Sequence, residues 1–334
     1  MGQLDDPANT FWQLLHAEPG SSKWSSVTPQ GVADNGGIVV APGVATDSVA
    51  VGFLPSQLLR FSPLSVSTNS GHTWSPGFFP GALTSSPNAL ATGPDGSLAL
   101  AGTTVLHQSS TQSKWTRLVT LATLRRVAPN CGVSSLQAVA VTPAGGAVVG
   151  AACDRGHLGL FSSSDGSWQP DVAVLQGAWH SASTTVLRVQ AASAQPTALV
   201  MAAQGGHRAL FVLTDDGAGH WKASSPRQIP ANSAVRASAV ELGGAFSVLA
   251  GSKRTASVAE VNTDGSWTSL PAPPKDTLGL AWVLPGSVSF GGLSLDAFTV
   301  VNGTELHVYA LTPAGIKWVL VQTLQVPLAY GSSG

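Results

Sequence analysis

Tryptophan recurs along this chain at a nearly constant interval. Seven of the ten tryptophans are separated by 50, 41, 53, 53, 46 and 51 residues, and they lie at positions 24, 74, 115, 168, 221, 267 and 318. A period of about fifty residues indicates repeated supersecondary units, because each unit buries its apolar surface only against its neighbours. This regularity constrains the fold more than any other feature of the sequence.

Polar turns and short strand-like runs fill each interval between tryptophans. The best-formed turn runs from Ser67 to Trp74, and looser versions end at Trp168, Trp221 and Trp267. In the repeat around Trp168, apolar and β-branched residues predict strands over 136–141, 147–151, 157–162 and 168–175. Four short strands in about fifty residues are typical of one propeller blade.

The sequence therefore predicts an all-β protein, a β-propeller in one domain over 1–334. The blades are expected over about 10–330, with tails at 1–9 and 331–334, and each blade is expected to be a four-stranded antiparallel sheet. In the preferred interpretation there are seven blades, and the ring is closed by pairing of N- and C-terminal strands. In the six-bladed alternative, Trp318 starts the outer strand of a sixth blade, and the N-terminal hairpin is an accessory.

Composition excludes several partners. Charged residues make up 10% of the chain and the formal net charge is −1, so no overall charge attracts nucleic acid. No stretch approaches the ~20 apolar residues of a membrane helix. The histidines are scattered singly, so we expect no metal site. We also expect no cofactor and a monomer. The first residues are acidic and polar and do not resemble a signal peptide, although a mature exported form with an added Met would look the same.

The two cysteines, Cys131 and Cys153, lie in the same repeat. Both are at predicted strand ends beside Gly, Asn and Asp, and not in an apolar run. This position favours a disulfide between them, which would suit an exported protein. Two buried free thiols are the alternative.

The segment from Ser67 to Trp74 resembles the Asp-box, or bacterial neuraminidase repeat, whose pattern is Ser/Thr-x-Asp-x-Gly-x-Thr-Trp, except that Asn69 replaces the Asp. The resemblance implies a sialidase-like propeller in which the box is the turn between the third and fourth strands of a blade and its Trp packs between blades. Such boxes occur in sialidases, in photosystem assembly factors and in non-catalytic exported propellers. The turn residues so implied are Ser67, Asn69, Gly71, Trp74, Asp165, Trp168, Asp216, Trp221, Asp264 and Trp267.

The residues of a sialidase active site are not found in this sequence. A sialidase-like site needs a tyrosine nucleophile assisted by a glutamate, but Glu305 and Tyr309 would lie about 13 Å apart along one strand. The alternative enzyme is a glycoside hydrolase that uses two carboxylates at the rim of the central channel. Its candidates are Asp34 and Asp276, which precede innermost strands and could equally cap turns there.

Basic residues from several repeats are predicted to share one loop face. An arc of this kind could bind an acidic glycan or an acidic protein surface. Its members are Arg125, Arg126, Arg155, His207, Arg208, Lys253 and Arg254. Trp179 lies in a loop before an inner strand, where its indole could stack on a sugar or plug the channel mouth. The sequence thus predicts an exported, non-catalytic propeller that acts as a binding or scaffold module.

Overall fold

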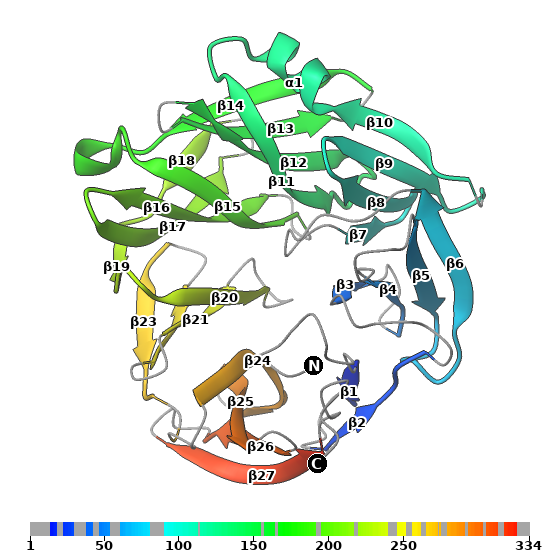
Figure 1. Cartoon of the computed structure of the whole chain (residues 1–334), viewed down its shortest axis with the longest axis vertical. Coiled ribbons are helices and arrows are strands. Elements are labelled where there is room, and N and C mark those ends of the chain that lie inside the picture. Colours follow the sequence, from blue (N-terminus) through cyan, green and yellow to red (C-terminus); the bar gives the residue numbers. More distant parts are fainter. Residues whose placement is uncertain are drawn as a thin grey trace.

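The computed structural model describes most of the chain, in segments. They are 14–18, 23–29, 38–42, 47–53, 61–80, 90–112, 114–154, 157–163, 166–191, 195–216, 220–239, 246–251, 256–261, 265–272, 274, 279–290, 293–302, 305–312 and 317–325. These segments form an all-β protein whose sheets follow one another around a ring, as in a β-propeller (Figure 1). Neighbouring strands within each sheet are antiparallel, which confirms that part of the prediction.

Three four-stranded sheets make up the first half of the ring. The first contains β3 (Ile38–Pro42), β4 (Val49–Phe53), β5 (Phe61–Ser67) and β6 (Ser75–Pro80). The second contains β7 (Leu90–Gly93), β8 (Gly96–Ala101), β9 (Thr104–Ser109) and β10 (Thr116–Thr120). Helix α1 (Leu121–Val127) leads into the third, which contains β11 (Val133–Val141), β12 (Ala147–Cys153), β13 (His157–Ser163) and β14 (Trp168–Val174).

Three further sheets continue the ring. After the short 3-10 helix η3 (Gly177–Trp179), the fourth contains β15 (Ser183–Gln190), β16 (Thr197–Gln204), β17 (His207–Asp215) and β18 (Trp221–Ala223), with β19 (Arg227–Ile229) as a fifth strand on β17. The fifth contains β20 (Ala234–Ala239), β21 (Phe246–Gly251), β22 (Ala256–Val261) and β23 (Trp267–Leu270). The last contains β24 (Gly279–Phe290), β25 (Leu293–Asn302), β26 (Glu305–Leu311) and β27 (Trp318–Gln325).

The preferred prediction of seven blades is wrong. The strands β1 (Leu15–Ala17) and β2 (Trp24–Ser26) pair only with each other among the described strands, so they form a two-stranded sheet. The C-terminal strand β27 pairs with β26 and completes the last sheet instead of joining them. The prediction failed because it assigned the strand that starts at Trp318 to a blade shared with the N-terminal hairpin.

The core consists of the layers between neighbouring sheets. All seven residues of β12 are buried, because sheets on either side cover both of its faces. The layers are thin where the residues are small: a Cβ built on Gly150 of β12 would lie 2.7 Å from a methyl carbon of Val186 in the next sheet. Phe161 of β13 is fully buried in the cluster that joins the first three sheets.

Three of the periodic tryptophans connect one sheet to the preceding one. The indole N–H of Trp74 donates to the Val27 carbonyl at 2.9 Å, and that of Trp318 donates to the Pro271 carbonyl at 2.9 Å. The indole N–H of Trp267 likewise donates to the Ser225 carbonyl at 3.1 Å. Donor and acceptor are 47, 47 and 42 residues apart in the sequence. The period of about fifty residues therefore corresponds to one sheet, because each of these bonds joins a sheet to the one before it.

The turn from Ser67 to Trp74 has the hydrogen bonds expected of a closed polar turn. The Ser67 hydroxyl accepts from the Gly71 N–H at 2.8 Å, and the Asn69 side-chain oxygen accepts from the Thr73 N–H at 2.9 Å. Gly71 has a φ of 84°, which favours glycine. Asn69 also donates to the Thr73 hydroxyl at 2.8 Å, a bond that an aspartate could not form.

The other implied turn residues are described only in part. The Asp216 side chain accepts from the His220 N–H at 3.2 Å, which places it in a turn before Trp221. Trp168 is half-buried and packs against the cluster that joins the first three sheets. Asp165 and Asp264 lie outside the described residues.

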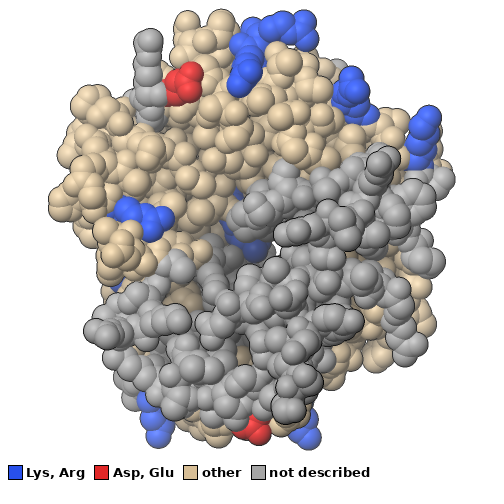
Figure 2. Space-filling view, viewed as in Figure 1, with Lys and Arg blue, Asp and Glu red and all other residues tan. Residues whose placement is uncertain are grey.

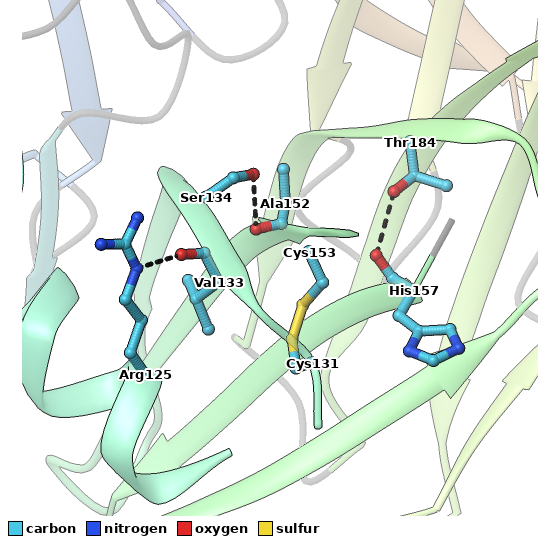
Figure 3. Close-up of a disulfide and its surroundings, with 8 residues drawn as sticks. All are labelled: Arg125, Cys131, Val133, Ser134, Ala152, Cys153, His157 and Thr184. Carbon is cyan, nitrogen blue, oxygen red and sulfur yellow. Dashed lines mark hydrogen bonds between the residues drawn. A yellow bond between two sulfur atoms is a disulfide. The ribbon is translucent and has the colours of Figure 1, made fainter. Parts of the chain in front are cut away.

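The predicted disulfide between Cys131 and Cys153 is confirmed. It ties the segment before β11 to the end of β12, next to α1 (Figure 3). Both cysteines are buried, at 1% and 8% exposure. The bond therefore ties the segment between α1 and β11 to the end of β12 in the third sheet.

The N-terminal hairpin is attached to the last sheet through a side chain. The carboxamide of Gln322 in β27 accepts from the Trp24 N–H at 2.8 Å and donates to the Trp24 carbonyl at 2.8 Å. The amide of Gln322 thus bonds Trp24 as a peptide group of a neighbouring strand would. This contact links segments 298 residues apart.

Replacing Gln322 with alanine is expected to loosen this link. Two hydrogen bonds to the Trp24 backbone are lost, which should cost about 1–3 kcal/mol of the free energy of unfolding. Chemical denaturation measures the loss. Gln325→Ala is the matched control, since Gln325 is exposed on the same strand and only donates to Glu305 at 3.4 Å. An equal loss of unfolding free energy in the two variants would contradict the conclusion that Gln322 holds the N-terminal hairpin to the last sheet.

Candidate functional site

The predicted basic arc is described only in part. Arg125 and Arg126 lie exposed on α1, and His207 is exposed at the start of β17. Arg155, Lys253 and Arg254 lie outside the described residues. Among the residues that Figure 2 colours, the Lys and Arg side chains lie mostly around the rim of the face in view, with one near its middle, and they do not gather into one patch. The arc as a whole therefore stays a prediction.

Two arginines of the arc have structural bonds. The Arg208 guanidinium donates to the carbonyls of Ala231 and Ser233, both at 2.9 Å, and so ties β17 to the turn before β20. Arg125 donates through Nε to the Val133 carbonyl, which joins α1 to β11 (Figure 3). These bonds use part of the hydrogen-bonding capacity that the sequence interpretation assigned to a ligand.

Trp179 is part of the core. Its side chain is only 9% exposed, and its ring lies 5.8 Å from that of Phe211 in an edge-to-face arrangement at 76°. It belongs to the cluster between the third and fourth sheets. The hypothesis of an exposed indole that stacks on a sugar is therefore corrected, because the ring is already covered.

The carboxylates proposed for catalysis, Asp34 and Asp276, lie outside the described residues. Among the described carboxyl groups, burial raises the pKa of Asp171 on β14, and the nearby charge of Asp215 raises it further. Burial also raises the pKa of Glu260 on β22. Neither group lines the cleft described next.

The described residues form a cleft of about 510 Å³ between the fourth and fifth sheets. It lies where the outer strand of the fourth sheet is interrupted: β18 pairs with the end of β17, whereas β19 pairs with its start. Proline has no N–H to donate, so it is tolerated in such edge positions. The residues that line the cleft are Pro226, Arg227, Gln228, Pro230, Ala250, Ser257 and Trp267.

The polar and aromatic groups of the cleft are held by bonds between the two sheets. The Trp267 indole is fixed by its bond to Ser225 at 3.1 Å, and Arg227 donates from Nη1 to the Ser269 hydroxyl at 2.9 Å. A guanidinium has several further N–H donors in a fixed plane. Gln228 is exposed, and Arg227 and Trp267 are half-buried. The described part of the lining contains one cation and no carboxylate.

Sequence reasoning missed Arg227 and Gln228 and assigned Trp267 only to the turn. A signal was present, because Pro226 and Pro230 bracket a short run that ends in Ile229. Proline on both sides of a strand-like run is typical of a short edge strand. The interruption of the outer strand, and hence the cleft, depends on the pairing of this run with β17.

Comparison with known proteins shows the fold alone. No family model and no curated protein matches the chain. A protein of Lactobacillus plantarum has a similar structure with a TM-score of 0.57, at 12% identity over 92% of this chain and 90% of that one. YCF48 bound to a D1 peptide has a TM-score of 0.51, at 10% identity over 88% and 91%. The six-bladed fucose-recognising lectin of the fungus Aleuria aurantia has a TM-score of 0.50, at 14% identity over 89% and 97%.

Among the described residues, no helix has the length and apolar character needed to cross a membrane.

Proposed function

We propose that this protein is a non-catalytic carbohydrate-binding β-propeller, and that it holds an acidic glycan in the cleft between β19 and β23. One observation carries the proposal: the cleft presents an indole, a guanidinium and an amide, and the first two are fixed in place by bonds between the two sheets. Groups that are already ordered lose little conformational entropy when a ligand binds.

The chemistry of the lining fits a sugar that carries a negative charge. A fixed indole offers an apolar face to the C–H groups of a sugar ring. The guanidinium of Arg227 suits a carboxylate or sulfate, which it can bind through parallel hydrogen bonds. The volume of about 510 Å³ lies within the range of small-molecule pockets. No carboxylate is among the described residues that line the cleft, whereas glycoside hydrolysis requires two, and this favours binding over catalysis.

Two further observations support this proposal. The disulfide between Cys131 and Cys153 suits an oxidising compartment, so we propose that the protein is exported. The Aleuria aurantia lectin, which is described as recognising fucose, has a similar fold, and this supports a sugar as the ligand of such a scaffold. The hydrogen-bonded turn from Ser67 to Trp74 supports the resemblance to the Asp-box, which we keep as part of the proposal.

A glycan array followed by calorimetry with the best ligand tests the proposal. Uronic acid or sulfated oligosaccharides are expected to bind, and Arg227→Ala is expected to weaken them by about ten- to a hundredfold, because a hydrogen bond to a charged group is lost. The neutral analogue of the same sugar should be nearly unaffected by this substitution. Arg126→Ala is the matched control, since Arg126 is an exposed arginine on α1.

Three results would contradict the proposal. If Arg126→Ala weakens binding and Arg227→Ala does not, the ligand lies at α1 and not in the cleft. If no acidic glycan binds the wild-type protein, the cleft has another role. Release of reducing sugar from a bound oligosaccharide would show that the protein is catalytic.

A further inference from the structure

The outer strands of the sheets differ in how well they resist pairing with another chain. An exposed edge strand presents unpaired N–H and C=O groups, and proteins blunt such edges with prolines, charges, bulges, breaks or short length. Most of the outer strands described here carry such a device. Prolines occur in β6 (Pro76 and Pro80) and in β14 (Pro170), and charged residues occur in β10 (Arg117), β14 (Asp171) and β18 (Lys222). The outer strand of the fourth sheet is also broken before β19, and β23 has only four residues.

The outer strand β27 has none of these devices except a one-residue bulge at Val321. Its eight residues, from Trp318 to Gln325, include no proline and no charged residue. Val319 and Leu320 are exposed at 44% and 47%, higher than any other large apolar residue described. The strand forms the rim of the molecule in Figure 1, and its only partner among the described strands is β26.

The register of β27 leaves two regular segments. Leu320 lies opposite Tyr309 and Gln322 opposite Val308, so Val321 is an extra residue in the ladder. On one side of it are Trp318–Leu320, and on the other are Gln322–Gln325. In an antiparallel pair related by a two-fold axis near Val321, the first segment of each copy lies opposite the second segment of the other. The irregular residues then meet at the axis, where they interrupt neither segment.

We propose that β27 pairs with β27 of a second copy of this chain, which joins the two last sheets into one continuous sheet. This surface is independent of the cleft, and the inference does not rest on the proposed function. The pairing is self-complementary, as a two-fold interface requires. With no charge in the strand, no like charges are placed opposite each other, and the net charge of −1 gives little repulsion between copies.

Charges at the ends of the strand favour a second copy as the occupant. Lys317 is exposed immediately before β27, and Gln325 at the other end donates to Glu305 at 3.4 Å. Antiparallel pairing brings the beginning of one β27 to the end of the other. Lys317 of each copy therefore lies at the same end of the joined sheet as Glu305 of the second copy, and the two-fold axis repeats this arrangement.

Sedimentation equilibrium over a range of protein concentrations tests the inference. The wild-type protein is expected to dimerise, in place of the monomer expected from the sequence. Leu320→Lys is expected to raise the dimer dissociation constant by about tenfold or more, because the two introduced lysines become diagonal neighbours across the two-fold axis on one face of the new ladder. Val172→Lys is the matched control: Val172 is 39% exposed on β14, an outer strand already blunted by Pro170 and Asp171. Near-UV circular dichroism confirms that each variant is folded.

A charge exchange tests the identity of the partner. Lys317→Glu alone should weaken the dimer, and the double variant Lys317→Glu/Glu305→Lys should restore it. The inference is overturned if the wild-type protein is monomeric at all concentrations. It is equally overturned if Leu320→Lys and Val172→Lys change the dissociation constant alike, or if the double variant stays as weak as the single one.

Discussion

Replacing Phe161 with alanine is expected to lower the free energy of unfolding by about 3–5 kcal/mol. Phe161 is fully buried in β13, in the cluster that spans the first three sheets. Its removal loses the transfer free energy of the ring and leaves a cavity that stiff strands on both sides cannot close. Guanidinium denaturation followed by tryptophan fluorescence measures the change.

The matched control for this variant is Phe161→Leu. It keeps a large apolar side chain at the same place, so its loss should be clearly smaller than that of Phe161→Ala. If both variants unfold at the wild-type denaturant concentration, the layer between the sheets contributes less to stability than its burial indicates. That result would contradict a core made of layers between neighbouring sheets.

Removal of the disulfide is expected to have the second largest effect. In the double variant Cys131→Ala/Cys153→Ala the free energy of unfolding should fall by about 3 kcal/mol, because a bridge between residues 22 apart restricts the unfolded chain. Both cysteines are buried, so alanine is preferred to serine, which would bury a hydroxyl without a partner. Denaturation is compared in the presence and absence of a reducing agent.

The reducing agent supplies the control for this prediction. It should destabilise the wild-type protein by a similar amount and leave the double variant unchanged. A wild-type protein that is equally stable in both conditions would mean that the bridge contributes nothing to the third sheet. A double variant that is itself sensitive to the reducing agent would point to an effect unrelated to this bond.

The repeat could be predicted from the sequence because its signals are local. The turn from Ser67 to Trp74 contains its own donors and acceptors, so its hydrogen bonds depend on residues no more than four positions apart. The strands between the turns follow from apolar and β-branched runs bounded by Gly, Pro and Asp. The disulfide was also predictable, since Cys131 and Cys153 lie at the two ends of one hairpin.

The arrangement of the chain ends and the candidate site could not be predicted, because both depend on distant contacts. Trp24 bonds to Gln322, and nothing in either local sequence indicates this pairing. The cleft arises because β19 pairs with the start of β17, which places Arg227 beside Ser269 of the next sheet. The sequence interpretation assigned Arg208 and Trp179 to ligand binding. In the structure their side chains contact Ser233 and Phe211, which belong to other elements and could not be identified from the local sequence.

The tryptophan bonds between sheets have a consequence for how such a chain can evolve. The indoles of Trp74, Trp267 and Trp318 donate to main-chain carbonyls, and the acceptors belong to residues as different as Val27, Ser225 and Pro271. Because every residue type has a carbonyl, the connection does not require a matching side chain on the adjacent repeat. A duplicated or exchanged repeat would therefore form this connection to its new neighbour at once, while the surface loops remain free to diverge.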